Sequence, residues 1–336
     1  MRSSENRMTN EPQSEQRLER LREEAWEKGV VAGRGVDVAG GPIPRKPGYY
    51  GQPVVKPPVW TWEIPLYFFF GGTAGMSAVI ATGAVLFHHV DLALAAMWVA
   101  AIAGAVLSPV LLIMDLGRPH LFLNMLRVFK LQSAMSMGAW ILSLFGACAV
   151  PGLIALELHA HQTFPGTLDQ LLRIAAGIFI FGSAIFGTLL ATYTGVLIGA
   201  TAIPAWFLHR TLLPIHFGTA GLGSAAAVLE LLGHRIAALN FLGFYAAGVE
   251  SALLIWLSVD KHGAADRAIH EHGTGWLIRI GEILNGPLAI VLRLFGQVPL
   301  AALSFLIGAL VSRVGWIAVG KVSGSDPESV FAAERY

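Results

Sequence analysis

A carboxylate, a guanidinium and an imidazole follow one another after an apolar run, in the stretch LLIMDLGRPHLFLNMLRVFK. Asp115 can accept or release a proton, Arg118 can hold a negative charge, and His120 can hydrogen-bond a carbonyl group. One interpretation is structural: Asp115 and Arg118 are three residues apart, and an ion pair between them closes a helix at a Gly-Arg-Pro turn. The other is a polar site for a molecule that dissolves in the bilayer.

The composition indicates what must surround these polar groups. Of the 336 residues, 54% are hydrophobic and 13% are charged, and the mean hydropathy is +0.61. Soluble domains carry about 25% charged residues. The chain is therefore predicted to be an all-α, polytopic membrane protein, with the lipid bilayer as its main surroundings.

Seven segments are long and apolar enough to cross a membrane, which takes about 20 mostly apolar residues. An eighth apolar run, Ile283–Leu292, contains Asn285, Gly286 and Pro287, and we expect a short, broken or re-entrant segment there. The expected total is about eight transmembrane helices. The seven clear spans are Ile64–Phe87, Leu92–Met114, Ser136–Leu156, residues 171–197, Thr211–Leu232, Ile236–Val259 and Leu294–Val319.

Lysine and arginine are unevenly distributed between the two faces. The face that receives the N-terminal segment, here called the near face, also receives Arg210 and the basic loops at 115–135 and 260–280. The opposite, far face receives Arg173, Arg235 and Arg293. By the positive-inside rule, the near face with the N-terminus is predicted to be cytoplasmic.

Polar residues of the first four spans are expected at one membrane level on the near face. The first and third spans begin there, and the second and fourth end there. Individual residues also have structural interpretations: Glu63 at the lipid headgroups, Tyr193 in an interfacial aromatic belt and His120 on a loop surface. The predicted binding site comprises Glu63, Tyr67, Asp115, Arg118, His120, Ser136, Trp140 and Tyr193.

These side-chain types suit a quinone, a ligand with two ring carbonyls and an apolar isoprenoid tail. Hydroxyl and imidazole groups hydrogen-bond carbonyls, and the tail packs against apolar helix walls. Reduction of a quinone consumes two protons, so ionisable groups must stand within reach of the ring. Menaquinone or ubiquinone is the expected ligand, bound as a substrate.

Three further carboxylates are candidates for proton transfer. Glu250 lies near the middle of the sixth span, where an unpaired charge is costly, so a functional role is expected. It belongs to a proton route, or it pairs with a hydroxyl such as Ser224 or Thr219 as a structural link. Glu230 near the far end of the fifth span and Glu157 just past the third have a second interpretation as far-face surface residues.

The sequence does not suggest a resident redox centre. Cys148 is the single cysteine, and one thiolate cannot hold an iron–sulfur cluster. His216 is the one histidine inside a predicted span, so a haem between two facing histidines is not expected. Neither a metal site nor a nucleic-acid partner is expected, because no zinc motif or phosphate-binding loop stands out.

Residues 1–59 differ from the rest in being polar, with a helix-prone part followed by a stretch rich in glycine and proline. We expect an arm that docks on a partner subunit, because Tyr49, Tyr50 and Trp60 favour burial. The alternative is a disordered tail. Residues 60–322 are then the transmembrane domain and residues 323–336 a C-terminal tail.

Four segments resemble the NrfD / polysulfide-reductase membrane-subunit family: WTWEIPLYFFFGGTAG, DLGRPHLFLNMLRVFKLQSAMSMGAWILSLFG, TYTGVLIGATAIPAW and SRVGWIAVG. The resemblance implies an eight-helix quinone-binding membrane anchor in two four-helix bundles, in the cytoplasmic membrane of a prokaryote. The quinone site would lie in the first bundle and include Glu63 and Tyr193, with Asp115 and Arg118 in the shared loop motif. The implied partners are a ferredoxin-like iron–sulfur subunit and a catalytic subunit, of the molybdopterin type or another.

The leading functional hypothesis is therefore a quinone-reactive membrane subunit of a respiratory oxidoreductase, inactive as an enzyme on its own. It would exchange electrons between a partner's cluster and the quinone pool, with or without proton translocation. A second hypothesis is an ion or small-molecule transporter with Glu250 at its core. A third is a plain membrane anchor whose pocket has degenerated.

Overall fold

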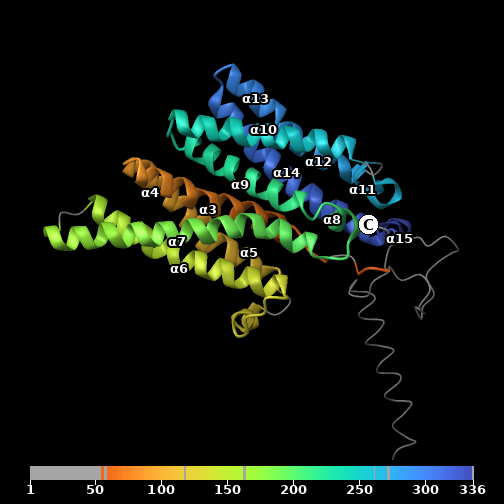
Figure 1. The fold of residues 1–336 in the computed structure, drawn as a ribbon, viewed down its shortest axis with the longest axis horizontal. Coiled ribbons are helices and arrows are strands. Elements are labelled where there is room, and N and C mark those ends of the chain that lie inside the picture. Colours follow the sequence, from red (N-terminus) through yellow and green to blue (C-terminus); the bar gives the residue numbers. More distant parts are fainter. Residues whose placement is uncertain are drawn as a thin grey trace, which may run out of the picture.

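The computed structural model describes residues 54–56, 59–116, 119–161, 164–260, 262–270 and 273–334, and the regular structure of these residues is entirely helical (Figure 1). The predicted arm lies outside the described residues, apart from 54–56 and 59. The helices are α3 (Glu63–Leu86), α4 (Val90–Val99), η1 (Ala100–Leu107), α5 (Ser108–Met114), η2 (Pro119–Leu126), α6 (Ala134–His161), α7 (Gly166–Gly199), α8 (Pro204–Leu208), α9 (Leu212–Leu231), α10 (Ala237–Val259), η3 (Gly263–Asp266), α11 (Arg267–His270), α12 (Gly273–Asn285), α13 (Pro287–Leu294), α14 (Val298–Ser325) and α15 (Pro327–Ala333).

Seven helical segments of the described chain are long and apolar enough to cross a membrane, α4, η1 and α5 forming one of them. The prediction of an all-α, multi-pass membrane protein is confirmed. Some boundaries differ from the predicted ones. The fourth span is the 34-residue helix Gly166–Gly199, and the last extends over Val298–Ser325, because charged residues near the ends of a long helix do not stop its backbone hydrogen bonds.

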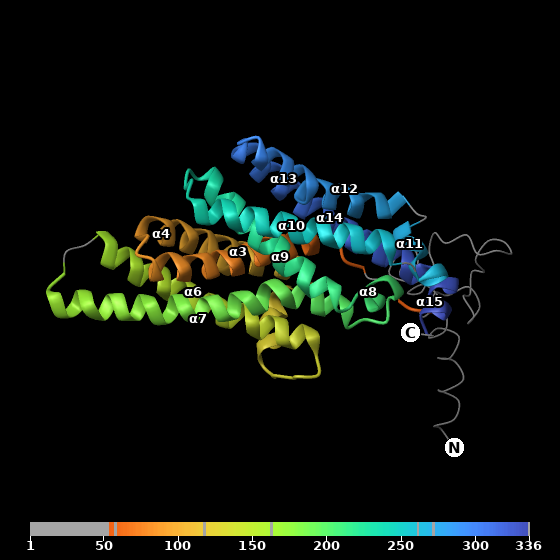
Figure 2. The same cartoon turned by 45° about the horizontal axis from the view of Figure 1, so that its top comes forward.

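The short apolar run Ile283–Leu292 falls across a break between two consecutive helices. α12 ends at Asn285, Gly286 adopts a non-helical conformation, and α13 starts with Pro287 as its first residue. Proline has no N–H to donate and is tolerated only in the first turn, so the chain must begin a new helix there. Together α12 and α13 run alongside α14 (Figure 2), but neither is among the seven segments long enough to cross a membrane, where about eight were expected.

The helices form two groups that meet along α3. The first group contains α3 to α7, and the second contains α9, α10, α12, α13 and α14 (Figure 1). α3 packs on α7 within the first group and on α9 of the second. A Cβ atom at Gly75 would overlap the backbone of Gly187 on α7, and one at Gly72 would meet Arg313 on α14. Small residues thus let α3 pack closely on α7 of its own group and on α14 of the second.

The second membrane segment changes its helical winding near its middle. Residues Ala100–Leu107 are π-helical, and the Ser108 hydroxyl donates to the carbonyl of Ala103 at 2.7 Å. Pro109 follows directly and cannot donate a backbone hydrogen bond. A π segment widens the helix locally and is frequent at functional sites.

The predicted C-terminal tail is largely ordered. Residues 323–325 continue α14, and α15 packs back against η3, α8 and the end of α14. The side chain of Asp326 caps α15 by accepting from the N–H of Glu328, and Ser329 and Val330 are buried. This end of the chain therefore covers the near face of the second group.

Candidate functional site

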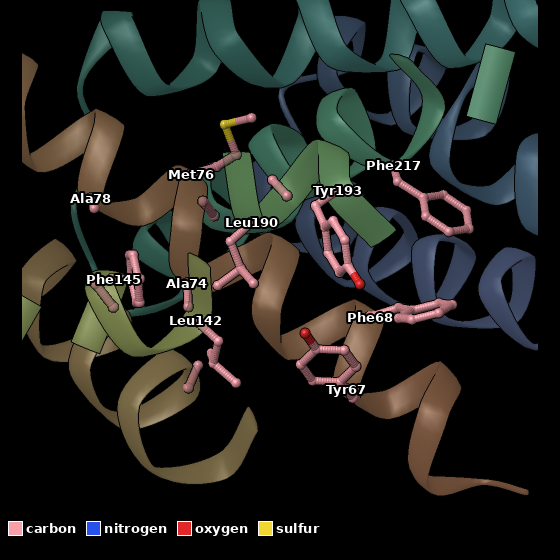
Figure 3. Close-up of a cluster of buried hydrophobic side chains, with 14 of the residues drawn as sticks. Tyr67, Phe68, Ala74, Met76, Ala78, Leu142, Phe145, Leu190, Tyr193 and Phe217 are labelled. Carbon is pink, nitrogen blue, oxygen red and sulfur yellow. The ribbon is translucent and has the colours of Figure 1, made fainter. Parts of the chain in front are cut away.

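Two tyrosines from neighbouring helices meet at the near end of the first group. Tyr67, one turn into α3, is 2% exposed, and Tyr193 on α7 is 6% exposed. Their hydroxyl groups both point into the space between the two rings (Figure 3). The Tyr193 hydroxyl also donates to the carbonyl of Ala134 at the start of α6, and its ring packs directly on Gly138.

Two carboxylates lie near each other at the same end. Glu63 begins α3, and Asp115 follows the last residue of α5. Partial burial, and then the charge of Glu63, raise the pKa of Asp115 above its usual range. A carboxyl group with a raised pKa holds its proton closer to neutral pH and can deliver it to a bound molecule.

The other predicted site residues have more peripheral positions. The Ser136 hydroxyl donates to the carbonyl of Val128 at 3.0 Å and accepts from the N–H of Lys130 at 3.1 Å, so it holds the preceding loop against α6. Trp140 packs edge-on against Phe129, and its indole nitrogen is buried without a hydrogen-bond partner among the described residues. The exposed side chain of His120 agrees with its loop-surface interpretation. Arg118 lies outside the described residues.

An apolar cleft of about 320 Å³ opens beside the last turn of α5, just before Asp115 in the chain. Leu112 and Ile113, in the last turn of α5, line one wall, and Leu142 of α6 lines another. Leu142 also belongs to the buried cluster that contains both tyrosines (Figure 3). The remaining lining residues come from η1, α5, η2 and α6: Ala105, Pro109, Phe122, Met125, Leu126, Ala139, Ser143, Gly146 and Val150. Its volume and lining resemble those of small-molecule sites.

A second polar site lies inside the other helix group. His216 on α9 contacts Glu250 on α10 through Nδ1 at 2.7 Å and Ser312 on α14 through Nε2 at 2.9 Å. The Ser312 hydroxyl lies 2.8 Å from Oε1 of Glu282 on α12, and the Thr219 hydroxyl donates to Glu250 at 2.6 Å. We call His216, Glu250, Glu282 and Ser312 the buried polar cluster; each is at most 1% exposed.

The charges in and around this cluster balance when one of its groups carries an additional proton. Arg313 is fully buried nearby; its guanidinium donates to the carbonyls of Ala309 and Phe217 and lies over the rings of Phe69 and Phe217. One arginine can offset one of two buried carboxylates. An apolar interior penalises the remaining charge strongly, so a proton on a carboxyl group or on the imidazole is needed for neutrality.

The remaining proton-transfer candidates have identifiable partners. Glu230 is buried, and Arg293 binds both of its oxygens at 2.7 Å. Arg293 therefore lies at the far end of the helices but is buried there, and the surface interpretation of Glu230 is wrong; the two charges compensate each other inside the protein. Glu157 accepts from the indole of Trp98 at 2.5 Å and lies 2.9 Å from His161 at the far end of α6.

Sequence reasoning found Glu250 and one of its hydroxyl partners, Thr219, but not the rest of the cluster. The other hydroxyl considered, Ser224, bonds to the carbonyl of Ala220 instead. Glu282 was missed because α12 starts ten residues before the apolar run expected at Ile283. Arg313 lies within a predicted apolar span, and a charged residue in such a position could have indicated this interior site.

The helices define a polytopic membrane protein, and two groups of polar side chains lie inside the bundle. The sequence model of the family described as "Polysulphide reductase, NrfD" matches residues 52–240. This match covers more than half of the chain, so the protein belongs to the NrfD family. It includes the tyrosine pair, Asp115 and His216, but not Glu250, Glu282 or Ser312. A search among curated proteins gives no match to this chain.

Proposed function

We propose that this protein is the quinone-binding membrane subunit of a respiratory oxidoreductase. It would exchange electrons between an iron–sulfur subunit docked on the near face and menaquinone or ubiquinone in the bilayer. A catalytic subunit, of the molybdopterin type or another, would complete the assembly. Within the described residues no cysteine set could carry a cluster, so the partner's clusters would supply the electrons to the quinone or accept them from the quinol.

The observation that carries this proposal is the arrangement at the near end of the first helix group. Glu63 lies near Asp115, and Tyr67, one turn further along α3, lies near Tyr193. An apolar cleft is lined by Leu112 and Ile113, which precede Asp115 in the chain. A quinone ring would lie among the polar groups, and the isoprenoid tail would follow the cleft. Membership of the NrfD family supports the same ligand class.

The proposed chemistry at this site is proton delivery and removal. Quinone reduction takes two electrons from the partner's cluster and two protons from the protein, and quinol oxidation returns both. Asp115 is suited to the proton step because partial burial and the charge of Glu63 raise its pKa above the usual range. The tyrosine hydroxyls would hydrogen-bond and orient the ring carbonyls.

The buried polar cluster favours a second, dependent role in proton translocation. Its two carboxylates and imidazole come from three helices, and a single proton can be shared among them. Ionisable residues in such positions are typical of proton relays. The transporter alternative relies on this same cluster, and it differs in requiring ion flux without a redox partner.

The test uses the complex purified with its partner subunits and reconstituted with menaquinone or ubiquinone. Asp115→Asn and Tyr193→Phe are each expected to reduce quinone turnover by about tenfold or more, as loss of an acid–base or orienting group does. Assembly, followed by size-exclusion chromatography, should be unchanged. Thr188→Val, at an exposed α7 position that bonds only within its own helix, is the control. Full turnover in both site variants would contradict the assignment.

A further inference from the structure

A separate group of histidines and carboxylates lies at the near end of the second helix group. His209 follows α8, Asp260 follows α10, and His262 precedes η3. One side-chain nitrogen or oxygen from each of these three residues lies within 4.8 Å of the others. These groups belong neither to the proposed quinone site nor to the buried polar cluster.

The ring of His209 is held so that its Nε2 atom is available to bind a metal ion. Its Nδ1 lies 2.9 Å from the carbonyl of Ala205, an acceptor, so Nδ1 carries the proton and Nε2 keeps its lone pair. The residue is 1% exposed, and Nε2 has no hydrogen-bond partner within the described chain. Metal-binding histidines characteristically donate their second nitrogen to a carbonyl or carboxylate in this way.

His262 lies between two carboxylates, both just beyond hydrogen-bonding distance of its ring nitrogens. Its Nε2 is 3.8 Å from Oδ1 of Asp260, and its Nδ1 is 3.9 Å from Oδ2 of Asp266. Asp266 is fully buried, and its Oδ1 has no hydrogen-bond partner among the described residues. His270 holds Oδ2 of Asp266 at 3.0 Å. A carboxylate behind a histidine is the outer arrangement that orients metal-ligating imidazoles.

We propose that His209, Asp260 and His262 bind one divalent transition-metal ion of the zinc class, with Asp266 as the positioning residue for His262. Two imidazole nitrogens and one carboxylate oxygen form a common three-ligand set for zinc, which leaves a fourth position for water. Metal–ligand bonds of about 2.0–2.2 Å would draw the three side chains closer together. The ion would fasten the turn after α10 to α8, independently of quinone chemistry.

The test measures metal directly on the full chain, purified in its complex through an affinity tag without histidines. After equilibration with zinc and removal of unbound ions, elemental analysis should give one zinc per chain above the buffer blank. In His209→Ala and in Asp260→Asn the bound zinc per chain should fall by about tenfold or more. Asp266→Asn should weaken zinc affinity by about 10–100-fold. His89→Ala and Asp91→Asn, exposed at the start of α4, should retain the wild-type content.

Cobalt substitution supplies a second readout. The wild-type protein loaded with Co²⁺ should show the visible ligand-field absorption of a low-coordinate nitrogen–oxygen site, and Asp260→Asn should lose it. Asp260 is partly exposed, so this variant keeps the test valid if His209→Ala fails to fold. A wild-type protein without bound zinc, or zinc content that is equal in wild type, His209→Ala and Asp260→Asn, would overturn the proposal.

Discussion

Arg293 of α13 binds Glu230 of α9 through two parallel hydrogen bonds of 2.7 Å, and both side chains are almost fully buried. Asn240 of α10 accepts a third bond from the same guanidinium at 2.8 Å, and a Cβ atom at Gly243 would overlap it. This ion pair therefore joins three helices of the second group at a place where the surrounding residues fit the guanidinium closely.

Breaking this pair should destabilise the protein more than removing it entirely. Glu230→Ala leaves a buried arginine without its counter-charge, at an expected cost of about 3–5 kcal/mol in the free energy of unfolding. The double variant Glu230→Leu/Arg293→Met should recover much of this loss. Thermal unfolding in detergent measures both, with the partly exposed Glu157→Gln as the control. A single variant as stable as wild type would show that the charge is not buried.

Substitution of Gly138 tests the position of Tyr193. A methyl group there would overlap the Tyr193 ring and displace it, with an expected cost of about 1–3 kcal/mol in stability. If Tyr193 orients the quinone, turnover should fall while the complex still assembles. Gly177→Ala, in α7 and outside the cleft, is the matched control, since a Cβ atom there would meet nothing within 4 Å. Equal turnover in the two variants would contradict the proposed role of Tyr193.

The pH dependence of quinone turnover should reveal the interaction between Glu63 and Asp115. The negative charge of Glu63 helps to raise the pKa of Asp115, so Glu63→Gln should lower that pKa towards its ordinary value. If protonated Asp115 supplies a proton to the quinone, turnover falls as the pH rises through this pKa. The variant should move that fall to lower pH. Asp115→Asn should remove it, and an unchanged profile in both would exclude Asp115 as the donor.

Glu250 should affect proton transport more than quinone chemistry. Glu250→Gln keeps a hydrogen-bonding side chain beside His216 and Thr219 but removes the proton exchange. In sealed proteoliposomes, the number of protons moved per electron should fall, while quinone turnover measured with an uncoupler stays close to wild type. Thr192→Val, on α7 and bonded only within its own helix, serves as the control. Unaltered proton stoichiometry would remove the cluster from the transport route.

The sequence predicted the helical class and most spans because an uninterrupted apolar run has few structural alternatives in a bilayer. The break at Gly286 was also anticipated, since Pro287 cannot continue the hydrogen bonding of α12. The π-helical winding of Ala100–Leu107 was not, because it depends on hydrogen bonds between backbone groups and leaves no periodic pattern in the side chains.

For the candidate sites, residue type and membrane level were predictable, but partners were not. The proximity of Glu63 to Asp115 follows from helices that begin and end on one face. The pairing of Glu230 with Arg293 depends instead on how α9 and α13 pack, and sequence spacing gives no measure of that. The quinone-site assignment itself stays a prediction for the experiments above.

The direct backbone packing of α3 has a mechanical consequence. This helix carries Tyr67 into the proposed quinone site, and two residues further on Phe69 lies under the guanidinium of Arg313, beside the buried polar cluster. At Gly75 the backbones of α3 and α7 are in direct contact. No side chain lies between them there that could absorb a displacement by changing its rotamer. A small tilt of α3 would therefore change the surroundings of the Tyr67 hydroxyl and of the Arg313 guanidinium at the same time.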